Sequence, residues 1–211
     1  MKVAWCVAAL LSAIISLPTP ARAAGLPLED ESLDRPRFYL GFGPLIGIEN
    51  FNVGNQPTSP GGPTVNADVT DQGWGGEMRA GYRFHPHFAA ELQGQYNGQY
   101  DVKGNTIGRP LLGTVRTVSS TANLKVYALR GIVQPYALGG LGILWADTED
   151  RSPGAQLPLG DVEFAGRGGI GVDTYIAPML AFTVEGTYIA PTGGLSGYGN
   201  AAITAGMQWH F

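Results

Sequence analysis

Three histidines are the residues of this chain best suited to bind a metal ion or to act as a general base: His85, His87 and His210. His85 and His87 flank Pro86 in a predicted tight turn and His210 is the penultimate residue, so the three imidazoles could meet at one rim as metal ligands. Catalysis would also need a nucleophile, and no Ser, Asp or Glu stands at a spacing that singles out a constellation with them. The sequence therefore predicts turn imidazoles without a catalytic site, a metal site or a cofactor.

Charged residues carry the other chemistry of the chain, because eight of them share the polar side of segments that alternate between apolar and polar positions. They are Glu77, Arg79, Arg83, Glu91, Lys125, Arg167, Asp173 and Glu185. Four are basic and four are acidic, and an unpaired charge in a narrow interior would be costly. A fold-back near residues 174–178 would also bring Glu185 close to Arg167. We expect a closed, charge-paired interior, and a small or gated conduit is the alternative.

The turn at His85–His87 predicts the register of one part of this network. If the turn is centred on Pro86, Glu91 lies directly opposite Gly81 on the neighbouring strand. Its carboxylate is then diagonal to Arg79 and Arg83, within reach of both long side chains.

The elements that position these charges are predicted by a hydrophobic period of two, which is typical of strands with two different faces. In the segment 74–84, apolar residues such as Met78 and Tyr82 alternate with Glu77 and Arg79. Similar segments recur from Phe38 to the end of the chain and number eight, although the two Gly-rich ones, 38–49 and 134–145, do not show which way they face. The fold class predicted is all-β: an eight-stranded antiparallel up-and-down transmembrane β-barrel.

The connections between these segments alternate between long and short. In order they are 50–73, 85–87, 97–116, 130–133, 146–160, 174–178 and 189–200. Outer-membrane barrels have short periplasmic turns and longer extracellular loops, with both chain ends on the periplasmic side. The alternation therefore predicts four long loops at the cell surface.

Aromatic residues favour a membrane barrel over a soluble barrel of the lipocalin type, which would turn its apolar face inward. Predicted to lie near the extracellular ends of strands are Trp74, Tyr96, Trp145 and Tyr188, and near the periplasmic ends are Phe38, Phe84, Phe88, Tyr175, Trp209 and Phe211. Two such rings would form the interfacial girdles of a membrane barrel.

The N-terminus has the pattern of a cleaved signal peptide over residues 1–23. A positive start and a short apolar run precede Ala21-Arg22-Ala23, so we expect cleavage after Ala23. Residues 24–36 form a predicted flexible, acidic periplasmic leader, and 37–211 the barrel. Cleavage removes two of the 13 basic residues and none of the 17 acidic ones, which leaves 11 against 17 and a net charge of −6. This balance argues against a nucleic-acid partner.

Two stretches, Pro135–Gly142 and Gly206–Phe211, resemble the bacterial outer-membrane barrel family that includes the outer-membrane protein A transmembrane domain, the opacity proteins and small porin-like surface antigens. The resemblance covers residues 37–211 and implies export to the cell outer membrane, among its lipids and lipopolysaccharide. It also implies that Met207, Trp209 and Phe211 form the signal read by the barrel assembly machinery, after passage with periplasmic chaperones. No peptidoglycan-binding domain follows Phe211, so no tether to the cell wall is expected.

Long loops rich in Gly, Pro, Ser and Thr are adaptable contact surfaces. We therefore expect a structural or surface-interaction role, like that of an adhesin or surface antigen, in which the loops meet host, matrix or neighbouring-cell ligands. A narrow channel for small or hydrophobic solutes is the alternative.

Overall fold

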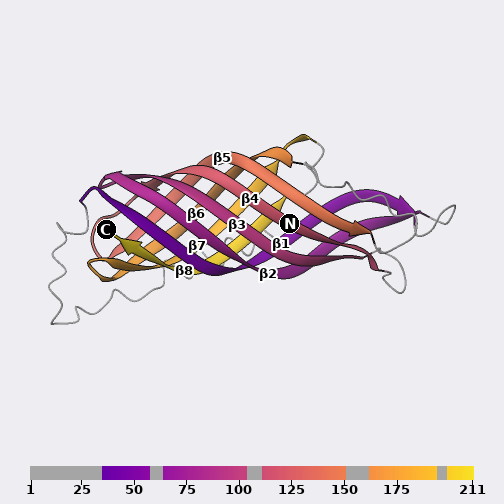
Figure 1. Cartoon of the computed structure of the whole chain (residues 1–211), viewed down its shortest axis with the longest axis horizontal. Coiled ribbons are helices and arrows are strands. Elements are labelled where there is room, and N and C mark those ends of the chain that lie inside the picture. The colour runs from indigo at the N-terminus through magenta and orange to yellow at the C-terminus, as the bar shows by residue number, and fades with distance from the viewer. Residues whose placement is uncertain (1–34, 58–63, 104–110, 151–161, 194–198) are drawn as a thin grey trace.

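The computed structural model describes residues 35–57, 64–103, 111–150, 162–193 and 199–211, and within them eight strands close into one antiparallel barrel (Figure 1). The strands are β1 (Arg37–Pro57), β2 (Thr64–His85), β3 (Phe88–Lys103), β4 (Leu111–Tyr127), β5 (Val133–Asp150), β6 (Val162–Ala177), β7 (Leu180–Pro191) and β8 (Asn200–His210). Each strand pairs with the next, and β8 pairs with β1 to close the sheet. The predicted up-and-down topology is confirmed. None of the described residues forms a helix long and apolar enough to cross a membrane.

The two faces of the wall differ as the alternation predicts. Large apolar side chains on the outer face are exposed, as Leu92 (64%) and Phe164 (75%) show, whereas most side chains buried in the interior are polar or charged. The soluble-barrel alternative is therefore wrong, because it required the apolar face to point inward. The two Gly-rich strands are now oriented: Tyr39 and Leu45 of β1, and Tyr136 and Leu144 of β5, are buried.

The predicted girdles need one correction. The exposed outer aromatics are Phe38, Phe84, Phe88, Trp209 and Phe211 toward one end of the barrel and Trp74, Tyr96, Trp145 and Tyr188 toward the other. Tyr175, predicted to join the first ring, is instead buried at 2% exposure. It has the same odd parity as Arg167 and Asp173 on β6, and that parity points inward.

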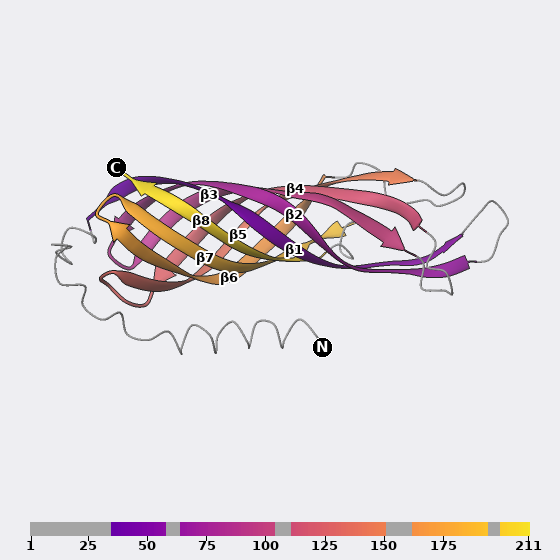
Figure 2. The same ribbon diagram turned by 90° about the horizontal axis from the view of Figure 1, so that it is seen from below.

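The strands run further than the sequence predicts. β1 continues to Pro57 and β2 begins at Thr64, so most of the connection predicted over 50–73 is a paired β ribbon. β3, β4 and β5 likewise extend into the predicted loops 97–116 and 146–160. Figures 1 and 2 show the β1–β2 ribbon projecting furthest from the barrel, at the end opposite the C-terminus. The predicted signal peptide, its cleavage site and the leader up to residue 34 lie outside the described residues.

Substituting a lipid-facing residue tests the orientation of the wall. We expect Leu92→Arg to lower the free energy of unfolding by about 2–4 kcal/mol in lipid vesicles, because the charge must enter hydrocarbon. Leu92→Ala controls for lost apolar contact, and urea titration of the refolded barrel measures both. If the Arg variant were no less stable than the Ala variant, Leu92 would not face lipid.

Deleting the last residue tests its predicted role in assembly. The backbone N–H of Phe211 donates to the Phe38 carbonyl at 2.9 Å, and its exposed ring continues the outward row of β8. We expect the deletion to reduce the folded, heat-modifiable protein in the outer-membrane fraction several-fold, and more than any single loop change does. Phe211→Tyr is the control that keeps a terminal aromatic, and equal yields from the parent and the deletion would contradict the assignment.

Candidate functional site

The barrel interior is the candidate site, because the structure places all eight charged residues singled out by the sequence there. β2 supplies Glu77, Arg79 and Arg83, β3 supplies Glu91, β4 supplies Lys125, β6 supplies Arg167 and Asp173, and β7 supplies Glu185. Each of these residues is at most 4% exposed because it occupies an inward-facing position of its strand. Five strands thus contribute charge to one enclosed volume.

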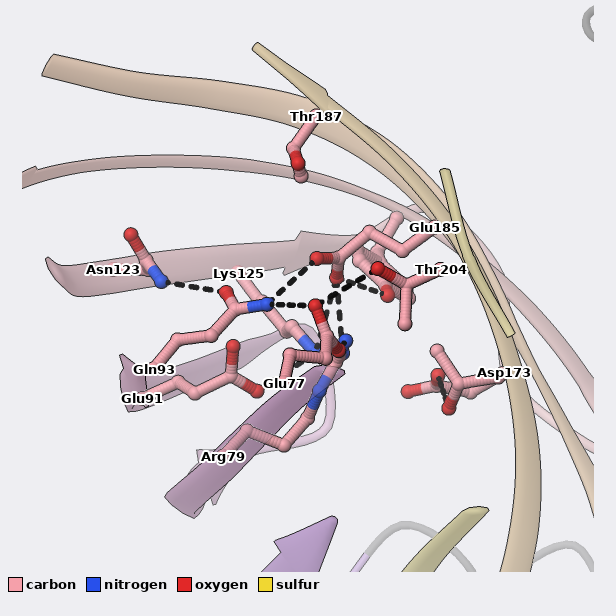
Figure 3. Close-up of polar contacts among 12 residues, drawn as sticks. Glu77, Arg79, Glu91, Gln93, Asn123, Lys125, Asp173, Glu185, Thr187 and Thr204 are labelled. Atoms are coloured by element: carbon pink, nitrogen blue, oxygen red, sulfur yellow. Dashed lines mark hydrogen bonds and ion pairs between the residues drawn. The ribbon is translucent and has the colours of Figure 1, made fainter. Parts of the chain in front are cut away.

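Glu185 lies at the centre of this network. One carboxylate oxygen accepts hydrogen bonds from Arg79 (3.0 Å) and the Tyr136 hydroxyl (2.6 Å) and lies 3.7 Å from the ammonium of Lys125. The other lies 3.5 Å from Arg167. Figure 3 shows Arg79, Lys125 and Glu185 converging across the lumen. One carboxylate therefore meets three cations from three different strands.

Glu77 forms a second carboxylate centre beside the first. It pairs with Arg79 and lies 3.8 Å from Arg167, while Gln93 and Thr204 donate to it at 2.8 and 2.9 Å. Gln93 also donates to Glu185 at 3.1 Å and so bridges the two carboxylates. Hydrogen bonds of this kind allow a buried ion cluster to offset its cost of desolvation.

Glu91 lies opposite Gly81, the register predicted from the turn. Its carboxylate contacts Lys125 at 2.8 Å and accepts a hydrogen bond from the Tyr39 hydroxyl at 2.9 Å. The Lys125 ammonium also lies 4.4 Å from the centroid of the Tyr136 ring. Glu91 therefore pairs with Lys125 of the next strand, a contact that the sequence did not predict.

Asp173 and Arg83 lie toward the turn end of the barrel, where hydroxyl, amide and carbonyl groups contact them. Asp173 accepts hydrogen bonds from the Tyr127 hydroxyl, Thr183 and Gln208 at 3.0, 2.7 and 3.0 Å. Arg83 donates to Gln134 (2.6 Å), the Tyr175 hydroxyl (3.4 Å) and the Pro86 carbonyl, and its guanidinium stacks over the Tyr127 ring. Three of the four predicted cations thus gather around three glutamates, and Asp173 is held by hydroxyl and amide hydrogen bonds.

Four interior tyrosines complete the network: Tyr39, Tyr127, Tyr136 and Tyr175. The sequence did not predict them, because only its charged residues were considered as interior partners. The first three each donate to a carboxylate, as described. Two of them lie directly opposite a glycine: a Cβ at Gly81 would come within 2.2 Å of the Tyr39 ring, and one at Gly171 within 2.5 Å of the Tyr136 ring. The signal available in the sequence was therefore an inward Tyr facing an inward Gly on the next strand.

A neutral polar layer lines β3 and β4 on the extracellular side of the charges. Asn97 donates to Thr117 at 2.9 Å, and Gln95 donates to Asn97 at 3.0 Å. The side-chain oxygens of Gln95, Ser119 and Thr121 are buried without a protein hydrogen-bond partner. Because buried polar atoms are satisfied by protein or by ordered water, we expect water in this layer.

The three histidines do not converge. His85 and His87 lie in the β2–β3 turn with ring centroids 5.8 Å apart, whereas His210 is buried in the barrel, 5.3 Å from the Tyr39 ring and 5.2 Å from the Tyr175 ring. Among the described residues, no group of three or more His, Cys, Asp or Glu side chains could hold a metal ion.

A closed sheet with an apolar outer wall and a polar, filled interior defines the class of outer-membrane β-barrels. Residues 7–211 match the family described as the outer membrane protein beta-barrel domain, and the chain belongs to that family. No curated protein matches the chain.

Solved structures show the same fold. Neisserial surface protein A is 13% identical with a TM-score of 0.59, covering 82% of this chain and 97% of its own. Ail, the attachment invasion locus protein of Yersinia pestis, in complex with the heparin analogue sucrose octasulfate, is 12% identical with a TM-score of 0.55, covering 84% and 99%. OprG from Pseudomonas aeruginosa is 16% identical with a TM-score of 0.54, covering 84% and 97%. At these identities the likeness shows the fold alone.

Neutralising the central carboxylate tests how the interior is held together. Glu185→Gln leaves three cations facing the remaining glutamates, and we expect the free energy of unfolding to fall by about 3–5 kcal/mol, the usual effect of breaking a buried ion pair. Urea unfolding in vesicles measures the change. In the matched double variant Glu185→Gln with Arg167→Gln, charge balance returns, so the loss should be smaller than the sum of the two single losses. Additive losses would show that the two residues are not coupled.

Proposed function

We propose that this chain is a surface-exposed outer-membrane barrel that binds host, matrix or neighbouring-cell ligands through its extracellular strand extensions and connections. The single observation that carries the proposal is the filled interior, in which three cations and three glutamates from five strands bridge the lumen. A barrel blocked in this way presents its outer end, rather than its lumen, to the surroundings.

The strand lengths support the same role. A tilted strand needs about 9–11 residues to cross the bilayer, and β7 and β8, with 12 and 11 residues, are close to that length. β1 and β2 have 21 and 22 residues. Their surplus forms a paired ribbon beyond the barrel, which costs backbone ordering and contributes nothing to spanning the membrane. We attribute this extra length of the ribbon to a role in binding ligands.

Two relatives in fold carry names that fit this proposal, one an attachment invasion locus protein and the other a surface protein. The ligand class need not be the same. Residues 49–57 and 64–74, the extracellular part of the β1–β2 hairpin, contain Glu49, Asp68 and Asp71 and no Lys or Arg. A sulfated sugar like the heparin analogue bound to Ail would meet only acidic charge there.

The proposal includes export by signal cleavage after Ala23, delivery by periplasmic chaperones and the barrel assembly machinery, and contact with outer-membrane lipid and lipopolysaccharide. The role is noncatalytic and needs no cofactor.

The second candidate is a narrow channel, and it is favoured by the neutral layer of unpartnered oxygens at Gln95, Ser119 and Thr121. That layer gives water a place to lie above the charge cluster.

Shortening the ribbon separates these two functions. Replacing residues 52–68 by an Asn-Gly turn keeps the pairing up to Phe51↔Val69, a pair whose backbone groups point toward each other, and suits a two-residue hairpin. We expect the variant to remain folded and heat-modifiable, and adhesion of expressing cells to immobilised matrix proteins to fall to the level of cells that lack the barrel. Uptake of a labelled monosaccharide and of an apolar dye should not change. Unchanged adhesion with reduced uptake would instead favour the channel.

A further inference from the structure

We propose that the free edge of β2, from Thr64 to Gly73, is a docking strand that binds an extended, basic segment of a partner protein by adding it to the sheet. The inference rests on the proposed surface-interaction function and names the partner class. It is carried by the backbone pairing of the extracellular ribbon.

The ribbon has edges that the barrel does not pair. β2 pairs with β3 only from Gly75↔Asn97 toward the turn, whereas its pairing with β1 continues to Pro57↔Thr64. In the described part of the chain, the β3-facing side of residues 64–73 therefore has no strand partner. At about 3.3 Å per residue this edge is roughly 33 Å long. Figures 1 and 2 show the ribbon separating from the neighbouring strands.

The other extracellular edges are shorter or interrupted. The pairing of β1 with β2 shifts between Asn52 and Asn55, and β1 ends in Pro57. The β3 extension shifts register between Asn97 and Tyr100 and again after Val102. Bulges and prolines are the devices that protect an edge from adding further strands. The β2 edge is longer than these runs and has no proline, so it is the least protected against strand addition.

The residues with free backbone groups follow from the register. The backbone N–H of Tyr127 donates to the His87 carbonyl. The backbone N–H and C=O groups of odd-numbered residues of β3 therefore point toward β4, and those of even-numbered residues point toward β2. Ala90 is even-numbered and pairs with Tyr82, so the backbone N–H and C=O groups of even-numbered residues of β2 point toward β3. Pairing of β2 with β1 is unbroken from Arg83 to Asp68, which preserves this parity. The N–H and C=O groups of Asp68, Thr70 and Gln72 therefore point to the open edge.

Charge selects the occupant. The extracellular part of the β1–β2 hairpin, residues 49–57 and 64–74, carries three acidic residues and no Lys or Arg, so a second copy of the same strand would bring like charges together. An incoming strand that carries Lys or Arg would complement it. Strand addition gains its affinity from main-chain hydrogen bonds and its specificity from alternate side chains. The favoured occupant is thus an extended basic segment of another protein.

A proline at the open edge tests the inference directly. Thr70→Pro removes one outward N–H and leaves the ladder to β1 intact, because that N–H does not face β1. Thr70→Val keeps the N–H and is the matched control. The probe is a synthetic peptide of alternating Lys and Val, with a Glu-for-Lys version and a version with alternate prolines as comparisons. Binding to the full-length barrel in nanodiscs is measured by fluorescence anisotropy and by amide hydrogen exchange over residues 64–73.

We expect the Lys peptide to slow exchange at Asp68, Thr70 and Gln72, and the Thr70→Pro variant to bind it about tenfold more weakly, because a backbone bond and its register are lost. Thr70→Val should bind like the parent. Equal binding by the Pro and Val variants, or preference for the Glu peptide, would overturn the inference. So would protection that increases with protein concentration in the absence of peptide, since a second copy would then occupy the edge.

Cell adhesion separates this inference from the proposed function on which it rests. If shortening the ribbon abolishes adhesion but Thr70→Pro does not, the surface-interaction function holds and the β2 edge is not its docking strand. If shortening the ribbon has no effect, the proposed function itself fails.

Discussion

Backbone N–H and C=O groups have no water to bond with in hydrocarbon, so every strand must pair with two neighbours. The rest of this structure follows from that requirement. Closing β8 onto β1 meets that requirement and forces each strand to present one face to lipid and one to the lumen. Apolar residues such as Leu92 and Phe164 occupy the first face. Polar residues occupy the second, where an eight-stranded barrel leaves room for side chains and little else.

The narrow interior explains why its charges are organised as a cluster. Charges enclosed by a closed wall can be satisfied only by each other and by neighbouring hydroxyl and amide groups. Glu185 and Glu77 gather the cations from β2, β4 and β6, and Gln93 bridges the two carboxylates. Tyrosine hydroxyls donate to three of the carboxylates, and glycines opposite two of the rings make the space for them. Pairing across strands thus crosslinks the barrel through its interior.

Much of this arrangement could be predicted from the sequence, because the alternation of apolar and polar residues and the alternation of long and short connections are both periodic. Alternation fixed which residues face inward, and the long-short pattern of connections fixed the topology. The strand extensions could not be predicted, because Gly-rich and Pro-rich segments such as 50–73 look like loops even where they pair. Partner choice failed for a different reason: Glu91 meets Lys125 rather than Arg79, and this depends on which way long side chains cross the lumen. Tyr175 was misplaced because a tyrosine suits a girdle and a polar interior equally well.

The account depends most on the claim that the paired charges close the lumen, and single-channel recording of the purified, folded protein in planar bilayers tests it most directly. The contacts around Glu185 predict no steady conductance beyond that of the bare membrane. A large, steady conductance from protein shown to be folded by its heat-modifiable migration would contradict a closed interior.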